Sequence, residues 1–329
     1  MKQQIIDLWK LSFGDSDDFI QLFFDRVYRD ENTIVIQKNG TVVSTLQILP
    51  YEMTYCGTTI PAGYICGVCT LPSEQGKGFM TQLMFTALEE MRNRDFALAI
   101  LIPASPQLFD VYRRFDFANA FDYSTEEIYF IDPAIEKGSK YENHLHANLR
   151  ILSHQDLSPA TIYTYYHSKQ RTRDCCVQHS ASQFETICKD WLLGKGEIWI
   201  AFSNEQPAGL AFTMLSTPEN VSFREIMAEN TEIKNALVQS VLNRHQLHKA
   251  ILRLPPTPTY SIPYGMAKII NKEQMVELYQ SFLMGGGQRS RFKVQGSNLP
   301  DFMNTSIPTL TQILLKYEQR QGFMNLMMD

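Results

Sequence analysis

Long apolar runs and clusters of positive charge are both missing from this sequence of 329 residues. No stretch approaches the roughly 20 consecutive apolar residues that a helix needs to cross a bilayer, and the N-terminus lacks the pattern of a secretion signal. The formal net charge is −5 and the pI about 5.8, with lysine and arginine spread along the chain. We therefore expect a cytoplasmic protein that binds neither nucleic acid nor an anionic membrane surface.

Cysteine is too scarce to hold the fold together. Six cysteines in a chain of this length do not make a disulfide framework. Cys175, Cys176 and His179 come nearest to a metal-ligand cluster, but adjacent thiols chelate poorly and no second ligand pair has a matching spacing. We expect no metal, and a structural role for these residues.

The length exceeds that of one ordinary domain. A chain of this size usually forms two or three domains, and a hydrophobic fraction of 44% is ample for their cores. The stretch from Pro133 to Lys140 has the composition of a linker, and the proline-rich segment 255–258 precedes a third piece. These breaks predict domains at residues 1–145, 146–260 and 261–329.

The stretch from Ala62 to Arg94 has the clearest local pattern. A strand-like run over residues 62–71 is followed by Pro72, and a polar turn at 73–78 leads into a helix. Apolar residues recur there at three- and four-residue spacing, namely Phe79, Met80, Leu83, Met84, Ala87, Leu88 and Met91. The sequence predicts a strand, a glycine turn and a helix with one buried face.

The turn has the composition of an anion site. Gly76, Lys77 and Gly78 stand beside the unpaired N–H groups of a helix start, which together favour a pyrophosphate. A nucleoside-triphosphate loop is excluded because no Lys-Ser or Lys-Thr pair follows the second glycine, and a dinucleotide fingerprint would need a third glycine. A glycine turn alone is more often structural, so a second motif has to support a ligand.

Gln75-Gly76-Lys77-Gly78-Phe79 resembles motif A of the GCN5-related N-acetyltransferases (GNATs), which holds the pyrophosphate of coenzyme A between a strand and a helix. Met80 departs from the motif, since the family prefers Gly or Ala there. By this resemblance, backbone N–H groups at residues 68–70 take the thioester carbonyl and residues 75–81 take the pyrophosphate. The implied cofactor-binding set is Val68, Cys69, Thr70, Gln75, Gly76, Lys77, Gly78, Phe79, Met80, Thr81 and Gln107.

A second motif follows a strand-like run at residues 96–102. The segment Leu108–Phe117 contains Tyr112-Arg113-Arg114-Phe115 and looks like motif B of the same family. The resemblance implies that Tyr112 lies near the sulfur of coenzyme A and protonates the departing thiolate. A tyrosine with a reference pKa near 10 stays protonated at neutral pH, whereas a thiol of pKa about 8.5 leaves as the thiolate.

The surrounding elements follow the order of a GNAT fold. Two helices come first, and Asn39-Gly40 then joins strand-like runs at 33–37 and 41–48. Further strands are expected at 52–56 and 121–131. Residues 197–254 repeat the strand, helix and strand order without the Gln-x-x-Gly turn. We expect an α/β (α+β) protein with tandem GNAT folds, each a mixed, mostly antiparallel sheet flanked by helices, the second copy degenerate.

The whole chain resembles the enhanced-intracellular-survival type of acetyltransferase, whose tail is sterol-carrier-like. The C-terminal piece begins near Met266-Ala267-Lys268, and Leu310–Tyr317 is similar to a helix of that tail. This tail is shorter than the family's, in which the terminal carboxylate reaches the active site and can act as base. The resemblance makes Asp329 a candidate base, leaves the choice of base open, and implies a homo-oligomer.

These patterns predict an acetyl-CoA-dependent N-acetyltransferase that acts on a primary amine of a small molecule or a lysine side chain. The negative net charge favours a cationic acceptor. A non-catalytic acyl-CoA-binding or lipid-binding protein on the same scaffold is the alternative, motivated by Met80 and the short tail. A tandem transferase that uses aminoacyl-tRNA is a further hypothesis, against which the acidic pI and the missing basic stripe count.

Overall fold

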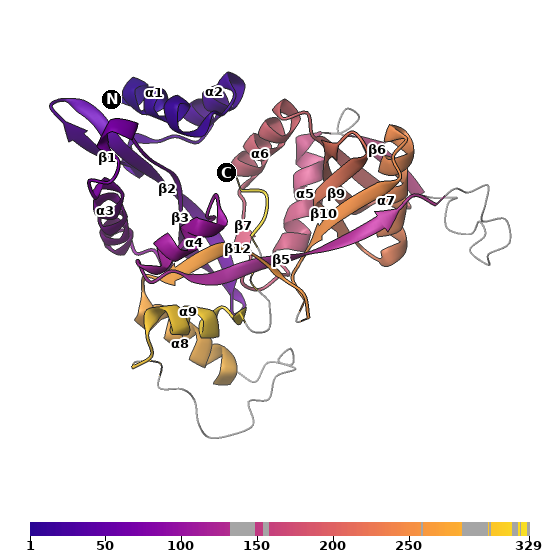
Figure 1. Cartoon of the computed structure of the whole chain (residues 1–329). Coiled ribbons are helices and arrows are strands. Elements are labelled where there is room, and N and C mark those ends of the chain that lie inside the picture. Colours follow the sequence, from indigo (N-terminus) through magenta and orange to yellow (C-terminus); the bar gives the residue numbers. More distant parts are fainter. Residues whose placement is uncertain are drawn as a thin grey trace.

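The computed structural model describes residues 1–131, 149–153, 158–257, 259–284, 302, 304–317, 322 and 324–327. Figure 1 shows two units side by side, joined by strands that run from one to the other. The predicted boundary at residues 145 and 146 and the candidate base Asp329 lie outside the described residues. No helix in the described ranges is long and apolar enough to cross a membrane.

The first unit begins with two helices that are defined by their ends. Gly14 terminates the first helix with a φ of 70°, and Ser16 caps the second by accepting a hydrogen bond from the Phe19 N–H at 3.2 Å. The elements of this unit are α1 (Lys2–Phe13), α2 (Asp17–Arg26), η1 (Asp30–Asn32), β1 (Thr33–Lys38), β2 (Thr41–Tyr55), β3 (Thr58–Thr70), η2 (Pro72–Glu74), α3 (Phe79–Asn93), β4 (Leu98–Leu101), α4 (Pro106–Arg113) and β5 (Ala118–Tyr129).

Helices cover both faces of the first sheet. Buried side chains alternate along β2 between two clusters, as the period of a strand requires. Leu49 and Tyr51 pack in the cluster that contains α1 and α2, whereas Leu46 and Ile48 pack in the cluster that contains α3 and α4. The sheet therefore lies between two layers of helices.

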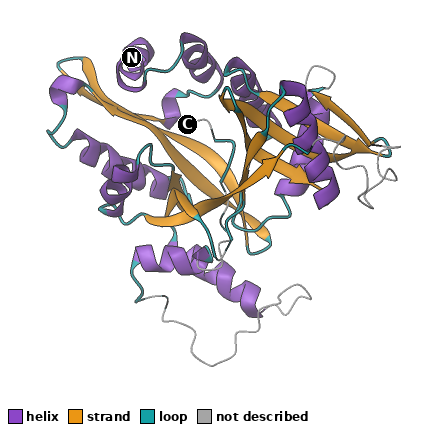
Figure 2. Ribbon diagram, turned by 45° about the vertical axis from the view of Figure 1, so that its right-hand side comes forward, coloured by secondary structure: helices purple, strands orange, loops and turns teal. Residues whose placement is uncertain are grey.

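The second unit repeats this order with helices on both faces (Figure 2). A Ser180–Gln183 capping box starts one of its helices. Its elements are β6 (Leu149–Ser153), α5 (Pro159–Gln170), β7 (Val177–Gln178), α6 (Ala181–Leu193), β8 (Glu197–Ser203), β9 (Gln206–Thr217), β10 (Asn220–Ala228), α7 (Thr231–His245) and β11 (Lys249–Leu254).

Two strands were expected at 41–48 and 52–56, but the single strand β2 covers both segments. The strand continues through Pro50, which pairs with Gly63 of β3. On its other edge β2 pairs with β1 before Pro50 and with β7 after it. Because Pro50 lies in the gap between these two partners, its missing N–H removes no hydrogen bond from either ladder.

β5 belongs to both units. Its first half pairs with β12 (Ile262–Ile269) and its second half with β11. The strand order is β1-β2-β3-β4-β12-β5-β11-β10-β9-β8-β6, with β7 paired to β2. Among the described strands only the β3–β4 and β10–β11 pairs are parallel. The predicted fold class, tandem units with mixed and mostly antiparallel strands flanked by helices, is confirmed.

The expected third region, 261–329, does not begin as a separate piece. Its first strand, β12, lies between β4 and β5 and so completes the sheet of the first unit. The reason is burial, since Met266, Ala267 and Ile269 are at most 2% exposed in this position. Two helices follow, α8 (Lys272–Met284) and α9 (Ile307–Leu314), and α9 packs on β12 and β5.

The described tail residues 324–327 contact both units, since Met324 packs against Gly265 of β12 and Asn325 against β10. The Asn325 side chain donates hydrogen bonds to the Arg224 carbonyl at 2.6 Å and to the Glu225 carboxylate at 2.9 Å, both on β10. Its own carbonyl lies 3.2 Å from Nε2 of His179, which follows β7. Burial lowers the pKa of His179 to about 4, so the ring is neutral at pH 7 and its Nε2–H donates to Asn325.

Candidate active site

In the first unit, the parallel strands β3 and β4 separate after a short paired stretch. β3 and β4 pair only from Ala62 to Tyr64, and β3 then continues to Thr70 paired with β2 alone among the described strands. The β2–β3 register shifts just beyond this point, and Gly67 there has a φ of +60°. A Cβ on Gly67 would lie 2.4 Å from a ring carbon of Trp9, so both the bulge and the close indole require glycine.

The turn that follows β3 leaves the start of α3 open. Gly76 and Gly78 have φ values of +74° and +83°, and no atom lies within 4 Å of the position that a Cβ would occupy on either. Gly78 is the N-cap of α3, and no side chain caps that helix end. The first N–H groups of α3 therefore remain available to an anion, as the sequence predicted.

A cavity of about 550 Å³ lies between this turn, the end of β3 and the end of α1. Eight of the eleven predicted cofactor-binding residues line it, namely Val68, Cys69, Thr70, Gln75, Gly76, Gly78, Phe79 and Met80. Leu11, Ser12 and Phe13 form the wall opposite, and sequence reasoning missed them. Their helical pattern predicts α1 but carries no sign of what the end of that helix faces.

Lys77, Thr81 and Gln107 are the predicted residues that do not line the cavity. The Lys77 ammonium donates to the Ser73 carbonyl at 2.9 Å and to the Glu74 carboxylate at 3.0 Å. Hydrogen bonds from Lys77 and Lys38 lower the pKa of Glu74, which fixes the carboxylate in its charged form. Lys77 is thus paired with Glu74, which itself lines the cavity, while Thr81 and Gln107 are exposed.

Tyr112 lies behind the cavity rather than on its surface. It is 6% exposed and packs with Ile65 of β3 and Leu83 of α3, in the cluster against which Val68 and Met80 also pack. Burial, with a smaller contribution from Cys66 on β3, raises the pKa of Tyr112 to about 12. Val68 and Met80 therefore belong both to the cavity wall and to the packing around this phenol.

The structure does not test the candidate base. Asp329 lies outside the described residues, and Met327 is buried in the core cluster that also contains Tyr64 and Cys69. Within the described ranges no group of three or more His, Cys, Asp or Glu side chains could hold a metal ion, and Cys175, Cys176 and His179 are each buried.

Comparison with known proteins points to one class of domain. Residues 2–120, which include the cavity and Tyr112, match the family model of the acetyltransferase (GNAT) domain. A search of the curated proteins finds no match.

Solved structures share the fold across both units. A GCN5-related N-acetyltransferase from Anabaena variabilis has a TM-score of 0.65 and 16% identity, over 84% of this chain and 72% of that one. Another from Kribbella flavida has a TM-score of 0.60 and 16% identity, over 81% and 68%. Eis1 from Mycobacterium abscessus has a TM-score of 0.63 and 13% identity, over 83% and 72%.

The match to an acetyltransferase (GNAT) domain over residues 2–120 supports N-acetyltransferase activity for the first unit. The second unit repeats the order of strands and helices of the first. The sterol-carrier-like character expected for residues 261–329 stays a prediction.

Proposed function

We propose that this protein transfers an acetyl group from acetyl-CoA to a primary amine, either of a small cationic molecule or of a lysine side chain. The observation that carries the proposal is the cavity at the open start of α3, where two glycines leave room for a pyrophosphate. The β3 residues beyond the last β4 pair line the same cavity, so backbone N–H groups of Val68 to Thr70 are well situated to hold a thioester carbonyl.

Each residue has one task in this proposal. The start of α3 and residues 75–80 hold the pyrophosphate, and β3 orients the thioester for attack. The amine nitrogen then bonds to the carbonyl carbon while the carbon–sulfur bond breaks, and the sulfur leaves with the electron pair. The ammonium proton must first go to a base, for which Asp329 remains the candidate by resemblance.

Tyr112 supplies the proton that the leaving sulfur needs. With a pKa of about 12 the phenol is protonated throughout the physiological range and can always donate. A phenol of this pKa is a weaker acid than a thiol of pKa about 8.5, so full transfer is uphill. Donation therefore accompanies the build-up of charge on sulfur, and the phenolate recovers its proton from solvent.

Tyr112→Phe tests the proposal. The variant keeps the packing and removes the proton, so we expect turnover to fall by roughly 10- to 1,000-fold while the affinity for coenzyme A is unchanged. The measurements are thiol release with a panel of amines and calorimetry with coenzyme A. Tyr165→Phe is the matched control, since it removes a buried hydroxyl from the second unit.

Two results would contradict the proposal in different ways. Unchanged turnover in Tyr112→Phe removes this tyrosine from the mechanism. Binding of acetyl-CoA without thiol release for any amine, in the unmodified chain, supports the non-catalytic alternative instead.

A further inference from the structure

The second unit has a cavity in the position that matches the acetyl-CoA cavity of the first. β10 and β11 are parallel and pair only from Asn220 to Phe223, after which a bulge turns β10 away, as β3 turns away from β4. A cavity of about 410 Å³ lies beyond this point, between the end of β10, the start of α7 and the residues at the end of α5. These three elements correspond to β3, α3 and α1 around the first cavity.

The two cavities differ in the residues that come from the end of α1 in the first unit and from the end of α5 in the second. Leu11 and Phe13 line the first cavity. Lys169 and Arg173 take the equivalent place in the second, and Lys234 of α7 joins them. The lining of the second cavity contains these three cations and no aspartate or glutamate.

The carboxylates that pair with these cations lie outside the lining. Lys169 contacts Glu229 at 2.6 Å and Lys234 contacts Glu126 at 2.8 Å, and both carboxylates are at least 40% exposed. Arg173 forms an ion pair with Glu225 at 3.8 Å and donates a hydrogen bond to the Gln170 side chain at 3.0 Å. Burial raises the pKa of Glu225. A ligand in the cavity would thus meet cationic groups whose paired carboxylates are not among the lining residues.

The donors suit a compact oxyanion. Two lysines, an arginine and Thr231 line the cavity, and ammonium and guanidinium groups bind phosphate through charge-assisted hydrogen bonds. At the start of α7 the Asn230 side chain already accepts the hydrogen bond of the Ile233 N–H. The volume falls within the range of small-molecule sites but offers no glycine turn for a coenzyme A pyrophosphate.

We infer that the second unit binds a small phosphate-type oxyanion in the cavity formed by Lys169, Arg173 and Lys234. This site is separate from the acetyl-CoA cavity and does not depend on the proposed acetyl transfer. The tandem repeat would then carry two ligand sites of different chemistry in equivalent places.

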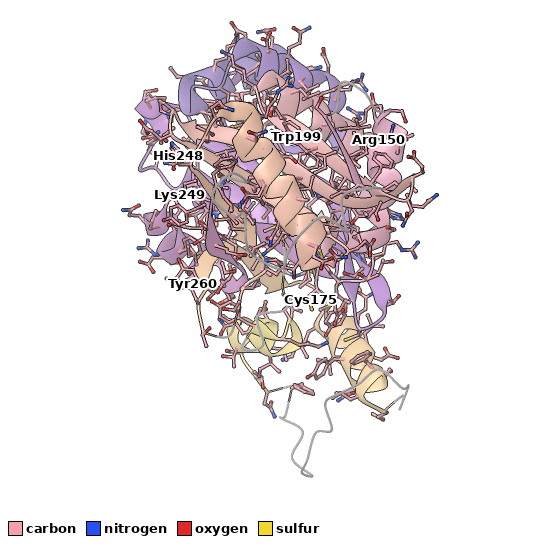
Figure 3. All side chains as sticks on the ribbon, turned by 90° about the vertical axis from the view of Figure 1, so that its right-hand side faces the viewer. Arg150, Cys175, Trp199, His248, Lys249 and Tyr260 are labelled. Atoms are coloured by element: carbon pink, nitrogen blue, oxygen red, sulfur yellow. The ribbon has the colours of Figure 1, made fainter. Side chains whose placement is uncertain are left out.

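Inorganic phosphate added to the full chain at constant ionic strength is the probe. In the unmodified protein we expect hydrogen exchange to slow in peptides that cover residues 169–173 and 226–234. The double variant Lys169→Gln/Lys234→Gln should weaken phosphate binding in calorimetry by about 10-fold or more, since charged hydrogen bonds are lost. Lys249→Gln is the matched control. Lys249, which is labelled in Figure 3, has a similar ion pair, to Glu127 at 3.0 Å, and does not line the cavity.

Unchanged exchange in both peptides of the unmodified protein overturns the inference without any variant. Equal weakening by Lys249→Gln also overturns it, because the effect would then be one of net charge. If the double variant does not fold, Lys169→Gln and Lys234→Gln are each measured alone, and each should still weaken binding. Slower hydrogen exchange at residues 75–80 would show that phosphate also binds at the start of α3. The slower exchange expected at residues 169–173 and 226–234 does not depend on that result.

Discussion

The starts of α3 and α7 occupy the same place in the two units and differ in how they are prepared for a ligand. Residues 71–78, with two glycines at positive φ, separate β3 from α3, whereas only Glu229 and Asn230 separate β10 from α7. No side chain caps α3, while the Asn230 side chain accepts a hydrogen bond from the Ile233 N–H at 2.9 Å. One helix start is open to an anion and the other is satisfied by its own chain.

The comparison teaches that a repeated fold does not repeat its site. In the second unit the tail also approaches the place where the strands part, since Asn325 binds Arg224 and Glu225 at the bulge of β10. The first unit has a long glycine turn there and an open cavity. The topology creates the gap between parallel strands, and local sequence decides what can enter it.

Separating the two units is the change with the largest expected effect. A fragment of residues 1–145 lacks β12, so β4 and the first half of β5 lose the strand between them, and the second half of β5 loses β11. We expect no cooperative unfolding transition, because the exposed apolar strands would associate. Circular dichroism melting and gel filtration check this. A monomeric fragment with a sharp transition would show that the first unit is independent.

The junction at His179 should make stability depend on pH. Its pKa is about 4 in the folded chain and 6.5 when exposed, so between these values the unfolded state binds more protons and stability falls as pH decreases. The loss is roughly 3 kcal/mol between about pH 7 and pH 4. Urea unfolding across this range measures it, with His179→Gln as comparison.

The variant should flatten that slope while the contribution of Glu225, whose raised pKa acts in the opposite direction, persists. An identical slope in His179→Gln would remove His179 from the pH response.

The open start of α3 is tested by Gly78→Ala. The methyl group would enter the space beside the first N–H groups, and we expect the KM for acetyl-CoA to rise by about 10- to 100-fold, the loss of one charged hydrogen bond. Gly57→Ala is the matched control, because Gly57 has a φ of +81° and equally open surroundings in the β2–β3 turn. Both variants should lose similar stability, and an equal rise in KM would exclude a special role for Gly78.

The smallest effect is expected for Asn230→Ala in the second unit. Loss of the cap should destabilise the protein by about 1 kcal/mol. It should not create a second acetyl-CoA site, because the two-residue connection before α7 remains too short to surround a pyrophosphate. Calorimetric stoichiometry with coenzyme A measures this. A second equivalent bound by the variant would show that the cap alone closes the second unit.

Much of the fold could be predicted because its signals are local. Asn39-Gly40 predicted the first hairpin, and apolar spacing predicted α3. The continuous β2 could not be predicted, since the tolerance of Pro50 depends on where β1 and β7 end. The role of Leu11 and Phe13 likewise depends on the opposite wall, which belongs to a different part of the chain.

The sequence by itself determined the glycine turn, the uncapped start of α3 and the segment around Tyr112, because backbone φ values and helix ends are decided by neighbouring residues. Only the tertiary structure decided that β12 completes the first sheet, that Tyr112 packs behind Val68, and that Asn325 binds β10. Those contacts connect residues far apart in the chain. They form because apolar burial and hydrogen bonding stabilise a contact regardless of how far apart the two residues are in the sequence.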